Sequence, residues 1–409
     1  MPDLLNRIHI GDALTILKTW PDEFVDCVCT SPPYWSLRDY GIEGQLGLEK
    51  TPEEYVENMV EVFREVKRVM KKEGTLWLNL GDSYAGSGKG LYGDGKSHGT
   101  EGKKQSTNVG SIGLPVWKGS ADNGSNIYGG AIHNNFSGLG TCKPKDLIGI
   151  PWRVAFALQA DGWYLRSDII WAKLNPMPES VRDRPTKAHE YIFLLSKSQK
   201  YYFDAEAVRE QSEWSSIPSK RYQSHDPNGS ERPGGNRKLE QPNPSGRNLR
   251  TVWTVSTQPF SGAHFATFPE EIPERCIKAG TSEKGCCPKC GKAWVRVVEK
   301  QRTGRGKTAS ELEDGIHNRS SAKSLAEKRQ AYRAMGMEGP PSSQTLGWQP
   351  SCLCDQFPYP CVVLDPFMGS GTVAKVAIRL RRNWIGIDIN PAYGKLAEKR
   401  KAWTQVEMG

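Results

Sequence analysis

The chain has 409 residues, of which 37% are hydrophobic, so it is long enough for one large core with insertions or for two domains. Its 55 Lys and Arg residues exceed its 46 Asp and Glu residues, and the resulting net charge of +9 favours a polyanionic partner. No window reaches the ~18 apolar residues of a membrane helix, and the N-terminus lacks the form of a signal peptide. We therefore expect a cytoplasmic protein with no membrane partner.

Residues 1–84 alternate between strand and helix patterns. Phe24–Cys29 is a short apolar run typical of a buried strand. Thr51–Glu54 has the form of a capping box with proline at the first helical position, and apolar residues then recur at helical spacing. Gly74 is predicted to end this helix, and Thr75–Leu80 is predicted to be the next strand.

A long polar segment, residues 85–141, interrupts this pattern. Gly, Ser, Asn and Lys dominate it, so we expect a flexible surface insertion. Core sequence resumes over residues 142–204, with a predicted helix at Trp152–Gln159 and predicted strands at Leu165–Trp171 and Tyr191–Ser196.

Two further insertions divide the rest of the chain. Residues 205–250 carry many Lys and Arg residues with aromatic residues between them, which favours a nucleic-acid-binding region. A core segment at 251–284 follows, and then an insertion at 285–355 with cysteines at both ends. Residues 356–409 return to strand, glycine loop, helix and strand. This order of elements indicates an α/β fold.

The glycine loop in the last segment is a candidate ligand-binding site. Its candidate residues are Asp365, Pro366, Phe367, Gly369, Ser370, Gly371 and Thr372. The glycines allow a ligand to approach the backbone, and the N-terminus of the following helix offers free N–H groups. About 20 residues on, the next strand ends in Asp388, the usual place of a carboxylate that binds ribose hydroxyls. The pattern predicts a nucleotide-like cofactor; an ordinary tight turn is the alternative.

A second motif follows the first strand: Thr30, Ser31, Pro32, Pro33, Tyr34 and Trp35. The two prolines stiffen the chain and leave backbone carbonyls free to accept hydrogen bonds. The amine of a nucleobase is a poor nucleophile, because its lone pair is delocalised into the ring. Acceptors that hold its N–H groups can expose that lone pair, and an aromatic face can stack on a flipped base. A proline-stiffened turn with aromatic packing is the alternative.

Together, the two motifs resemble a known family. The Ser-Pro-Pro-Tyr segment is similar to the catalytic motif of amino-group DNA methyltransferases, and Asp365–Thr372 is similar to their cofactor loop. The order of the motifs resembles the beta class. This resemblance implies a circularly rearranged, Rossmann-like, S-adenosylmethionine-dependent methyltransferase fold with a mixed sheet and helices on both faces. It also implies a target recognition region between the motifs, with residues 31–35 as the catalytic centre.

The resemblance further implies contacts with the cofactor. Asp12 and Ala13 are similar to the segment that contacts the cofactor adenine, although Asp12 can also cap the following helix. The segment His264–Pro269 is similar to the motif that closes over the methionine end, with Thr267, Phe268 and Pro269 as its candidate cofactor-binding residues. Asp365 would hold the methionine ammonium, and Asp388 would hold the ribose.

The resemblance also indicates the substrate. Family members that act on cytosine usually carry Ser at the first motif position, whereas adenine enzymes usually carry Asp, so Ser31 favours methylation of the N4 amine of cytosine. The family resemblance implies double-stranded DNA as the substrate and a bacterial or phage-infected cell as the location. A restriction endonuclease acting on the same site is a possible partner. The alternatives are N6-adenine methylation, an RNA methyltransferase, and a noncatalytic zinc-containing nucleic-acid-binding protein. Cytosine C5 methylation would need a cysteine nucleophile, and we interpret Cys27 and Cys29 as core residues.

Ten cysteines in a cytoplasmic protein indicate metal ligation or core packing rather than disulfides. The candidate zinc ligands are Cys287, Cys290, Cys352 and Cys354. The first pair has the Cys-x-x-Cys-Gly spacing of a zinc knuckle, and four thiolates would close a structural tetrahedral site. Such a site would join the ends of the insertion. Cys286 and His317 are alternative ligands, and a loop of reduced cysteines without metal is the other interpretation.

Overall fold

A computed structural model describes seven segments of the chain: residues 2–37, 42–85, 142–143, 145–210, 246–258, 269–300 and 343–396. The chain divides into two compact units. The first comprises residues 1–204, 250–295 and 350–409, and the second comprises residues 205–249 and 296–349. Nearly all of the predicted flexible insertion at 85–141 and most of the basic stretch at 205–250 lie outside the described residues.

The first unit is built on an eight-stranded sheet in the order β1-β10-β9-β2-β3-β5-β4-β6. Its strands are β1 (Arg7–Ile10), β2 (Val25–Thr30), β3 (Met70–Leu80), β4 (Tyr164–Lys173), β5 (His189–Ser196), β6 (Val252–Val255), β9 (Val362–Asp365) and β10 (Asn383–Asp388). The five strands from β1 to β3 run parallel to one another. β5 is antiparallel to both of its neighbours, and β6 is parallel to β4. The predicted mixed α/β sheet is thereby confirmed.

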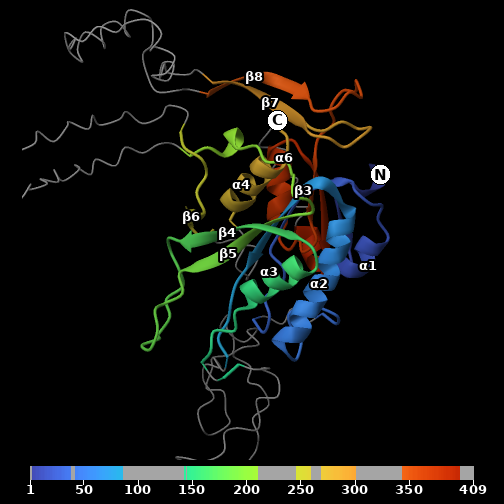
Figure 1. Cartoon of the computed structure of the whole chain (residues 1–409). Helices are drawn as coiled ribbons and strands as arrows, with labels where there is room; N and C mark the ends of the chain where they lie inside the picture. Colours follow the sequence, from blue (N-terminus) through green and yellow to red (C-terminus); the bar gives the residue numbers. More distant parts are fainter. Residues whose placement is uncertain are drawn as a thin grey trace, which may run out of the picture. The chain divides into compact units, whose positions relative to one another are not determined.

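The helices of this unit form two groups, which lie on opposite faces of the sheet (Figure 1). They are α1 (Ala13–Lys18), α2 (Pro52–Val69), α3 (Ile150–Ala160), α4 (Glu271–Gly280) and α6 (Thr372–Arg379), with a short 3-10 turn, η1, at Pro2–Leu4. α1, α2 and α3 pack into one hydrophobic cluster that includes Val28 of β2. α4 packs against α6 and β2 on the other side. Among the described residues, no helix is both long and apolar enough to cross a bilayer.

The start of α2 follows the prediction, but its end does not. Thr51 caps the helix by accepting a hydrogen bond from the Glu54 N–H (3.1 Å). The helix stops at Val69, so the prediction that Gly74 ends it was wrong. Gly74 instead lies within β3, where the pairing with β2 shifts in register. A Cβ at this position would lie 2.5 Å from Met70 Cγ and 3.0 Å from the Lys71 carbonyl oxygen, both in β3, and 3.1 Å from the Asp26 carbonyl oxygen in β2, so the crowding around this position favours glycine.

The insertion at 285–355 contains two strands that the sequence did not indicate to us, β7 (Trp294–Lys300) and β8 (Ser343–Pro350), which pair with each other. In the second unit, Arg296 lies over the ring of Trp348 at 4.4 Å and donates to the Thr345 hydroxyl. The described part of the second unit also contains a 3-10 turn, η2, at Glu206–Val208. The predicted circular rearrangement stays a prediction.

Candidate active site

The two motifs meet at one edge of the sheet. Because β2, β3, β9 and β10 are parallel, their carboxyl ends lie at the same edge, which is where open α/β sheets bind ligands. Ser31 follows β2, Asp365 ends β9 and Asp388 ends β10. The buried Thr30 hydroxyl donates to Asp365 Oδ1 at 2.7 Å. The predicted catalytic motif and the predicted cofactor loop are therefore joined directly.

The glycine loop is organised around its two carboxylates. Asp365 Oδ1 also accepts from the Phe367 N–H at 3.1 Å. Asp388 accepts from the N–H groups of Gly369 and Asn390, both at 2.7 Å. Gly369 (φ 53°) and Gly371 (φ 78°) adopt the left-handed conformation that side chains disfavour. The backbone path that brings the loop back to the N-terminus of α6 therefore favours glycine at both positions.

Both carboxylates are buried without a basic partner within the described part of the chain. Asp365 is 4% exposed and Asp388 is 9% exposed. Burial raises the pKa of Asp365 to about 7, and it also raises the pKa of Asp388. A buried carboxylate of this kind is stabilised by a cation, so Asp365 suits a ligand that carries an ammonium group.

Asp12 lies beside this loop, because the Gly11 N–H donates to the Asp388 carbonyl at 2.9 Å. Asp12 caps α1: its Oδ1 accepts from the backbone N–H of Thr15 at 2.8 Å and from the Thr15 hydroxyl at 2.6 Å. The capping role that we considered is therefore present, and the contact with the cofactor adenine stays a prediction. Ala13 is buried in the first turn of the same helix.

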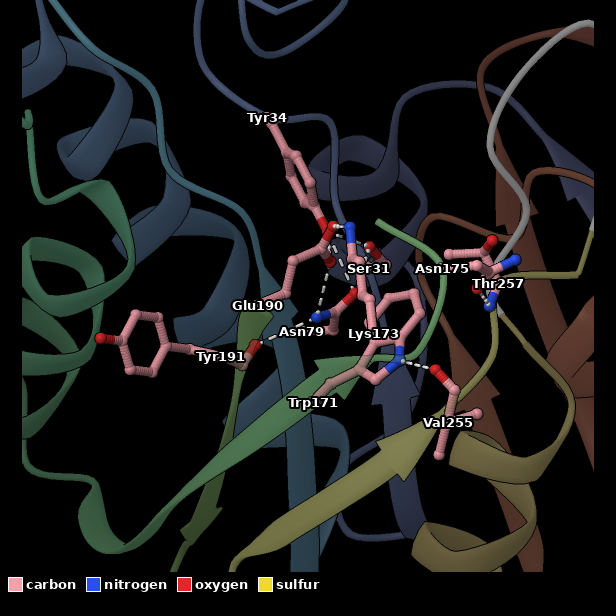
Figure 2. A network of polar contacts seen from close by, with 10 residues as sticks. All are labelled: Ser31, Tyr34, Asn79, Trp171, Lys173, Asn175, Glu190, Tyr191, Val255 and Thr257. Atoms are coloured by element: carbon pink, nitrogen blue, oxygen red, sulfur yellow. Dashed lines mark hydrogen bonds and ion pairs between the residues drawn. The ribbon is translucent and has the colours of Figure 1, made fainter. Parts of the chain in front are cut away.

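Asn79, Glu190 and Lys173 converge on Ser31 and Tyr34 of the first motif (Figure 2). The Tyr34 hydroxyl donates to Glu190 Oε2 at 2.7 Å and lies 3.2 Å from Ser31 Oγ. Asn79 Oδ1 lies 3.1 Å from Ser31 Oγ and 3.0 Å from the Tyr34 hydroxyl oxygen. Lys173 Nζ donates to Glu190 Oε1 at 2.6 Å. Burial raises the pKa of Tyr34 well above its usual value, and the neighbouring Glu190 carboxylate raises it further.

The structure separates the roles of the motif's aromatic residues. Gly81 lies under the Tyr34 ring, where a Cβ would collide with it. Trp35 is 5% exposed, belongs to the hydrophobic cluster and donates its indole N–H to the Glu49 carbonyl. Its burial gives it a packing role and leaves no open face for a base. The Pro33 carbonyl accepts from the Tyr55 hydroxyl at 2.8 Å, whereas the Pro32 carbonyl has no hydrogen-bond donor among the described residues and is the better placed of the two to accept from a ligand.

Sequence reasoning missed Asn79, Glu190 and Lys173. Asn79 did carry a signal, because it is the one polar residue in the apolar run Leu76–Leu80, and a buried amide needs partners. Glu190 and Lys173 lie at facing ends of β5 and β4. Only the antiparallel pairing of these strands brings them together, so they carried no comparable signal.

The four predicted zinc ligands come together. The Sγ atoms of Cys287, Cys290, Cys352 and Cys354 all lie within 4.8 Å of one another. Gly291 has φ 72° and closes the first turn by donating its N–H to the Cys287 carbonyl at 2.9 Å. The alternative ligand Cys286 lies instead beside Asp26 and Cys361 in the core, and His317 lies outside the described residues.

Two other predictions concern residues around this site. Thr267 and Phe268 lie outside the described residues, while Pro269 is buried two residues before the start of α4. Cys27 and Cys29 are fully buried in β2, as their interpretation as core residues requires. Burial raises the pKa of the Cys29 thiol well above its usual value, which keeps the thiol protonated and unreactive.

The chain is similar to known DNA methyltransferases. The family of N6/N4 DNA methylases matches residues 25–287 and 361–399. Type II methyltransferase M.Cfr9I of Citrobacter freundii is 36% identical over 390 residues, covering 95% of this chain and 85% of its own. Type II methyltransferase M.SmaI of Serratia marcescens is 34% identical over 394 residues, covering 96% and 90%. The structure of the PvuII DNA methyltransferase (cytosine-N4-specific) aligns with a TM-score of 0.48 at 16% identity, covering 96% of this chain and 85% of its own.

The chain therefore belongs to the N6/N4 DNA methylase family. Membership rests on matches that include both motifs, since the matched segments begin in β2 and end beyond β10. A noncatalytic nucleic-acid-binding protein is correspondingly disfavoured.

Proposed function

We propose that the protein transfers a methyl group from S-adenosylmethionine to the N4 amine of a cytosine in double-stranded DNA. The observation that carries the proposal is the hydrogen bond from Thr30 to Asp365, which joins the Ser-Pro-Pro-Tyr segment to the carboxylate of the glycine loop. A methyl donor held at Asp365 and an amine held at Ser31 would then lie on adjacent strands of the same sheet edge.

The residues of the glycine loop fit this cofactor. S-adenosylmethionine carries an ammonium group, a ribose and a sulfonium-bound methyl group that it supplies to a nucleophile. Asp365 would bind the ammonium, which restores the charged form that burial disfavours. Asp388 would accept from the ribose hydroxyls, and Asp12 and Ala13 would contact the adenine. Thr267, Phe268 and Pro269 would close over the methionine end, with Gly369–Thr372 lining the loop.

The first motif would hold the target amine. Ser31 Oγ and the Pro32 carbonyl would accept the two N–H groups of a cytosine flipped out of the duplex. Holding both N–H groups draws the nitrogen toward tetrahedral geometry and exposes its lone pair for in-line attack on the methyl group. No covalent bond to the enzyme forms, so catalysis consists of positioning and electrostatic stabilisation.

N6-adenine methylation is the alternative within the same family. Adenine and cytosine present similar amine-bearing edges, so the hydrogen-bond acceptors alone do not separate them. Ser31 in place of Asp supports cytosine, because the family resemblance associates Ser at this position with that base. The identity of the methylated nucleoside decides between the two.

Replacing Ser31 tests the proposed role of the motif. Ser31→Ala should abolish methyl transfer and leave S-adenosylmethionine binding intact, because Asp365 and the glycine loop are unchanged. Calorimetric titration with S-adenosylmethionine measures binding, and incorporation of radiolabelled methyl groups into DNA measures transfer. Full activity of Ser31→Ala would contradict the proposed role. A matching loss of cofactor binding would show that the variant is damaged beyond the amine site.

We further propose that Cys287, Cys290, Cys352 and Cys354 bind one structural zinc ion. Support comes from four Sγ atoms within 4.8 Å of one another and from the tight turn at Gly291, both typical of closed tetrahedral zinc sites. Metal analysis should find one zinc per chain. Cys290→Ser should lose it, whereas Cys142→Ser, outside the cluster, should keep it. Wild-type protein free of zinc would contradict this assignment.

The remaining proposals concern DNA and a partner enzyme. The basic residues of 205–250 would contact phosphates and read part of the target site. The relatives' designation as Type II methyltransferases supports a restriction endonuclease of the same site specificity as a partner. DNA methylated by this protein should then resist cleavage by that endonuclease.

A further inference from the structure

We infer that Glu190 takes up the proton that the methylated amine must lose, through the hydroxyl groups of Ser31 and Tyr34. This inference rests on the proposed function in one respect only, namely that Ser31 holds the amine. It applies to the amine of cytosine and of adenine alike. Glu190 would supply the final proton acceptor that the site needs, because the neutral hydroxyl of Ser31 cannot keep an additional proton.

The three groups form a continuous chain (Figure 2). Ser31 Oγ lies 3.2 Å from the Tyr34 hydroxyl oxygen, and the Tyr34 hydroxyl donates to Glu190 Oε2 at 2.7 Å. When the Tyr34 proton is directed at the carboxylate, the Tyr34 oxygen can accept from Ser31, in competition with Asn79 Oδ1, which lies 3.1 Å from Ser31 Oγ and 3.0 Å from the Tyr34 oxygen. Ser31 Oγ then keeps a lone pair for the N–H of a substrate. With the protons in this arrangement, the hydrogen bonds lead from the amine through Ser31 and Tyr34 to Glu190.

The carboxylate at the end of this chain is held in a fixed orientation. Lys173 binds Glu190 Oε1 at 2.6 Å, and the Asn79 amide donates to Oε2 at 3.2 Å and to the Tyr191 carbonyl at 3.0 Å. The side chains of Glu190 and Lys173 are 14% and 22% exposed. Lys173 Nζ also lies 4.8 Å from the centre of the Trp171 ring. These contacts leave Oε2 facing Tyr34.

The transfer balances in three proton movements. When the amine nitrogen bonds to the methyl carbon, the carbon–sulfur bond breaks and its electron pair stays on sulfur. The nitrogen then carries a positive charge and must lose one of its two protons. That proton passes to Ser31 Oγ, the Ser31 proton passes to Tyr34, and the Tyr34 proton passes to Glu190. Both hydroxyl groups are neutral again at the end, and Glu190 has become a carboxylic acid.

The carboxylate also acts before the proton moves. Positive charge grows on the amine nitrogen in the transition state, and a negative group joined to it by aligned hydrogen bonds stabilises that charge. Glu190 therefore serves as a positioning residue during methyl transfer and as the terminal acceptor after it. A change of Glu190 should lower the rate of transfer without weakening the binding of either substrate.

Single-turnover methylation of unmethylated bacterial DNA by the full chain tests this pathway. Glu190→Gln keeps the size and polarity of the side chain but cannot take up a proton. Tyr34→Phe keeps the ring and removes the middle of the chain. Each variant should lower the rate constant by about 10²-fold, the usual scale of acid–base assistance. The dissociation constant of S-adenosylmethionine and the KM for DNA should stay within twofold of wild type.

The double variant separates a shared pathway from independent damage. If Tyr34 and Glu190 belong to one chain, the rate for Tyr34→Phe/Glu190→Gln should equal that of the slower single variant. The control is Glu179→Gln, which also removes a carboxylate paired with a basic residue, Arg184 at 2.7 Å, but one outside the chain. It should keep the wild-type rate.

Three results would overturn the inference: a wild-type rate for Glu190→Gln, multiplied losses in the double variant, or a loss confined to KM. The nucleoside product of the same reactions reports separately on the proposed function. N6-methyladenine as the product would contradict the choice of cytosine. The comparison of wild-type and variant rates would still test the proton pathway. A wild-type protein that transfers no methyl group would overturn both.

Discussion

The Thr30 hydroxyl donates a buried hydrogen bond of 2.7 Å to Asp365 Oδ1 across 335 positions of sequence. Thr30 ends β2 and Asp365 ends β9, and these strands are parallel neighbours in the sheet. The bond orients the carboxylate proposed to hold the cofactor and fixes the start of the segment proposed to hold the amine. The relative position of the two reacting groups therefore depends on a contact within the rigid sheet rather than on loops.

Removing this hydrogen bond should weaken cofactor binding. Thr30→Val keeps the shape of the side chain and leaves Asp365 without its hydroxyl donor, a loss of about 1–3 kcal/mol. We expect the dissociation constant of S-adenosylmethionine to rise about tenfold or more, as measured by calorimetry. Thr19→Val, which removes an exposed hydroxyl bonded to the Ile16 carbonyl, is the control and should bind normally. Unchanged binding by Thr30→Val would show that the bond does not orient Asp365.

The raised pKa of Asp365 makes the stability of the cofactor-free protein depend on pH. Burial places this pKa at about 7, against 3.8 for an unperturbed Asp. Between these values the folded state keeps a proton that the unfolded state has lost, so the contribution of Asp365 to the free energy of unfolding falls as pH rises. The slope is at most about 1.4 kcal/mol per pH unit.

The Asn variant isolates this effect. Asp365→Asn does not titrate, so its stability relative to wild type should increase between pH 5 and pH 7.5. Urea unfolding of both proteins at several pH values measures the difference, and other groups cancel in the comparison. A difference that stays constant with pH would mean that Asp365 is ionised in the folded protein throughout this range.

A buried ion pair at the opposite edge of the sheet should matter for stability rather than for catalysis. Lys71 Nζ lies 2.7 Å from Asp26 Oδ1, with side chains only 12% and 10% exposed, and Asp26 Oδ2 accepts from the Val362 N–H. Lys71→Met leaves a buried carboxylate unpaired and should cost about 3–5 kcal/mol. Arg64→Met breaks an ion pair in which the Arg64 side chain is 59% exposed, and it should cost less than about 1 kcal/mol. Equal losses in urea unfolding would contradict this ranking.

A cysteine nucleophile should have no part in the reaction. Cys29 lies fully buried in β2, and burial raises the pKa of its thiol well above the usual value. Cys29→Ala should therefore keep most of the methyl-transfer rate and lose only the stability expected of a small core truncation. A variant that folds, binds S-adenosylmethionine and transfers no methyl group would point to chemistry at that thiol.

The sequence was most informative where local pattern and backbone requirement coincide. The left-handed backbone of Gly369 and Gly371 favours glycine, and the prolines after β2 form a local motif, so both features could be recognised before the fold was known. Gly74 misled the prediction, because glycine suits a crowded position within a strand as readily as a helix end. Glu190 and Lys173 could not be predicted, because their pairing depends on the register of two antiparallel strands. Pairing of β7 with β8 depends in the same way on contacts between distant segments.

The identity of the methylated nucleoside tests the central claim most directly. Unmethylated DNA incubated with the protein and S-adenosylmethionine is digested to nucleosides, which are separated by chromatography against standards and weighed. Chromatography is essential, because N4-methylcytosine and 5-methylcytosine have the same mass. The wild type should yield N4-methylcytosine, and Ser31→Ala should yield none. N6-methyladenine, 5-methylcytosine or no methylated nucleoside from the wild type would contradict the account.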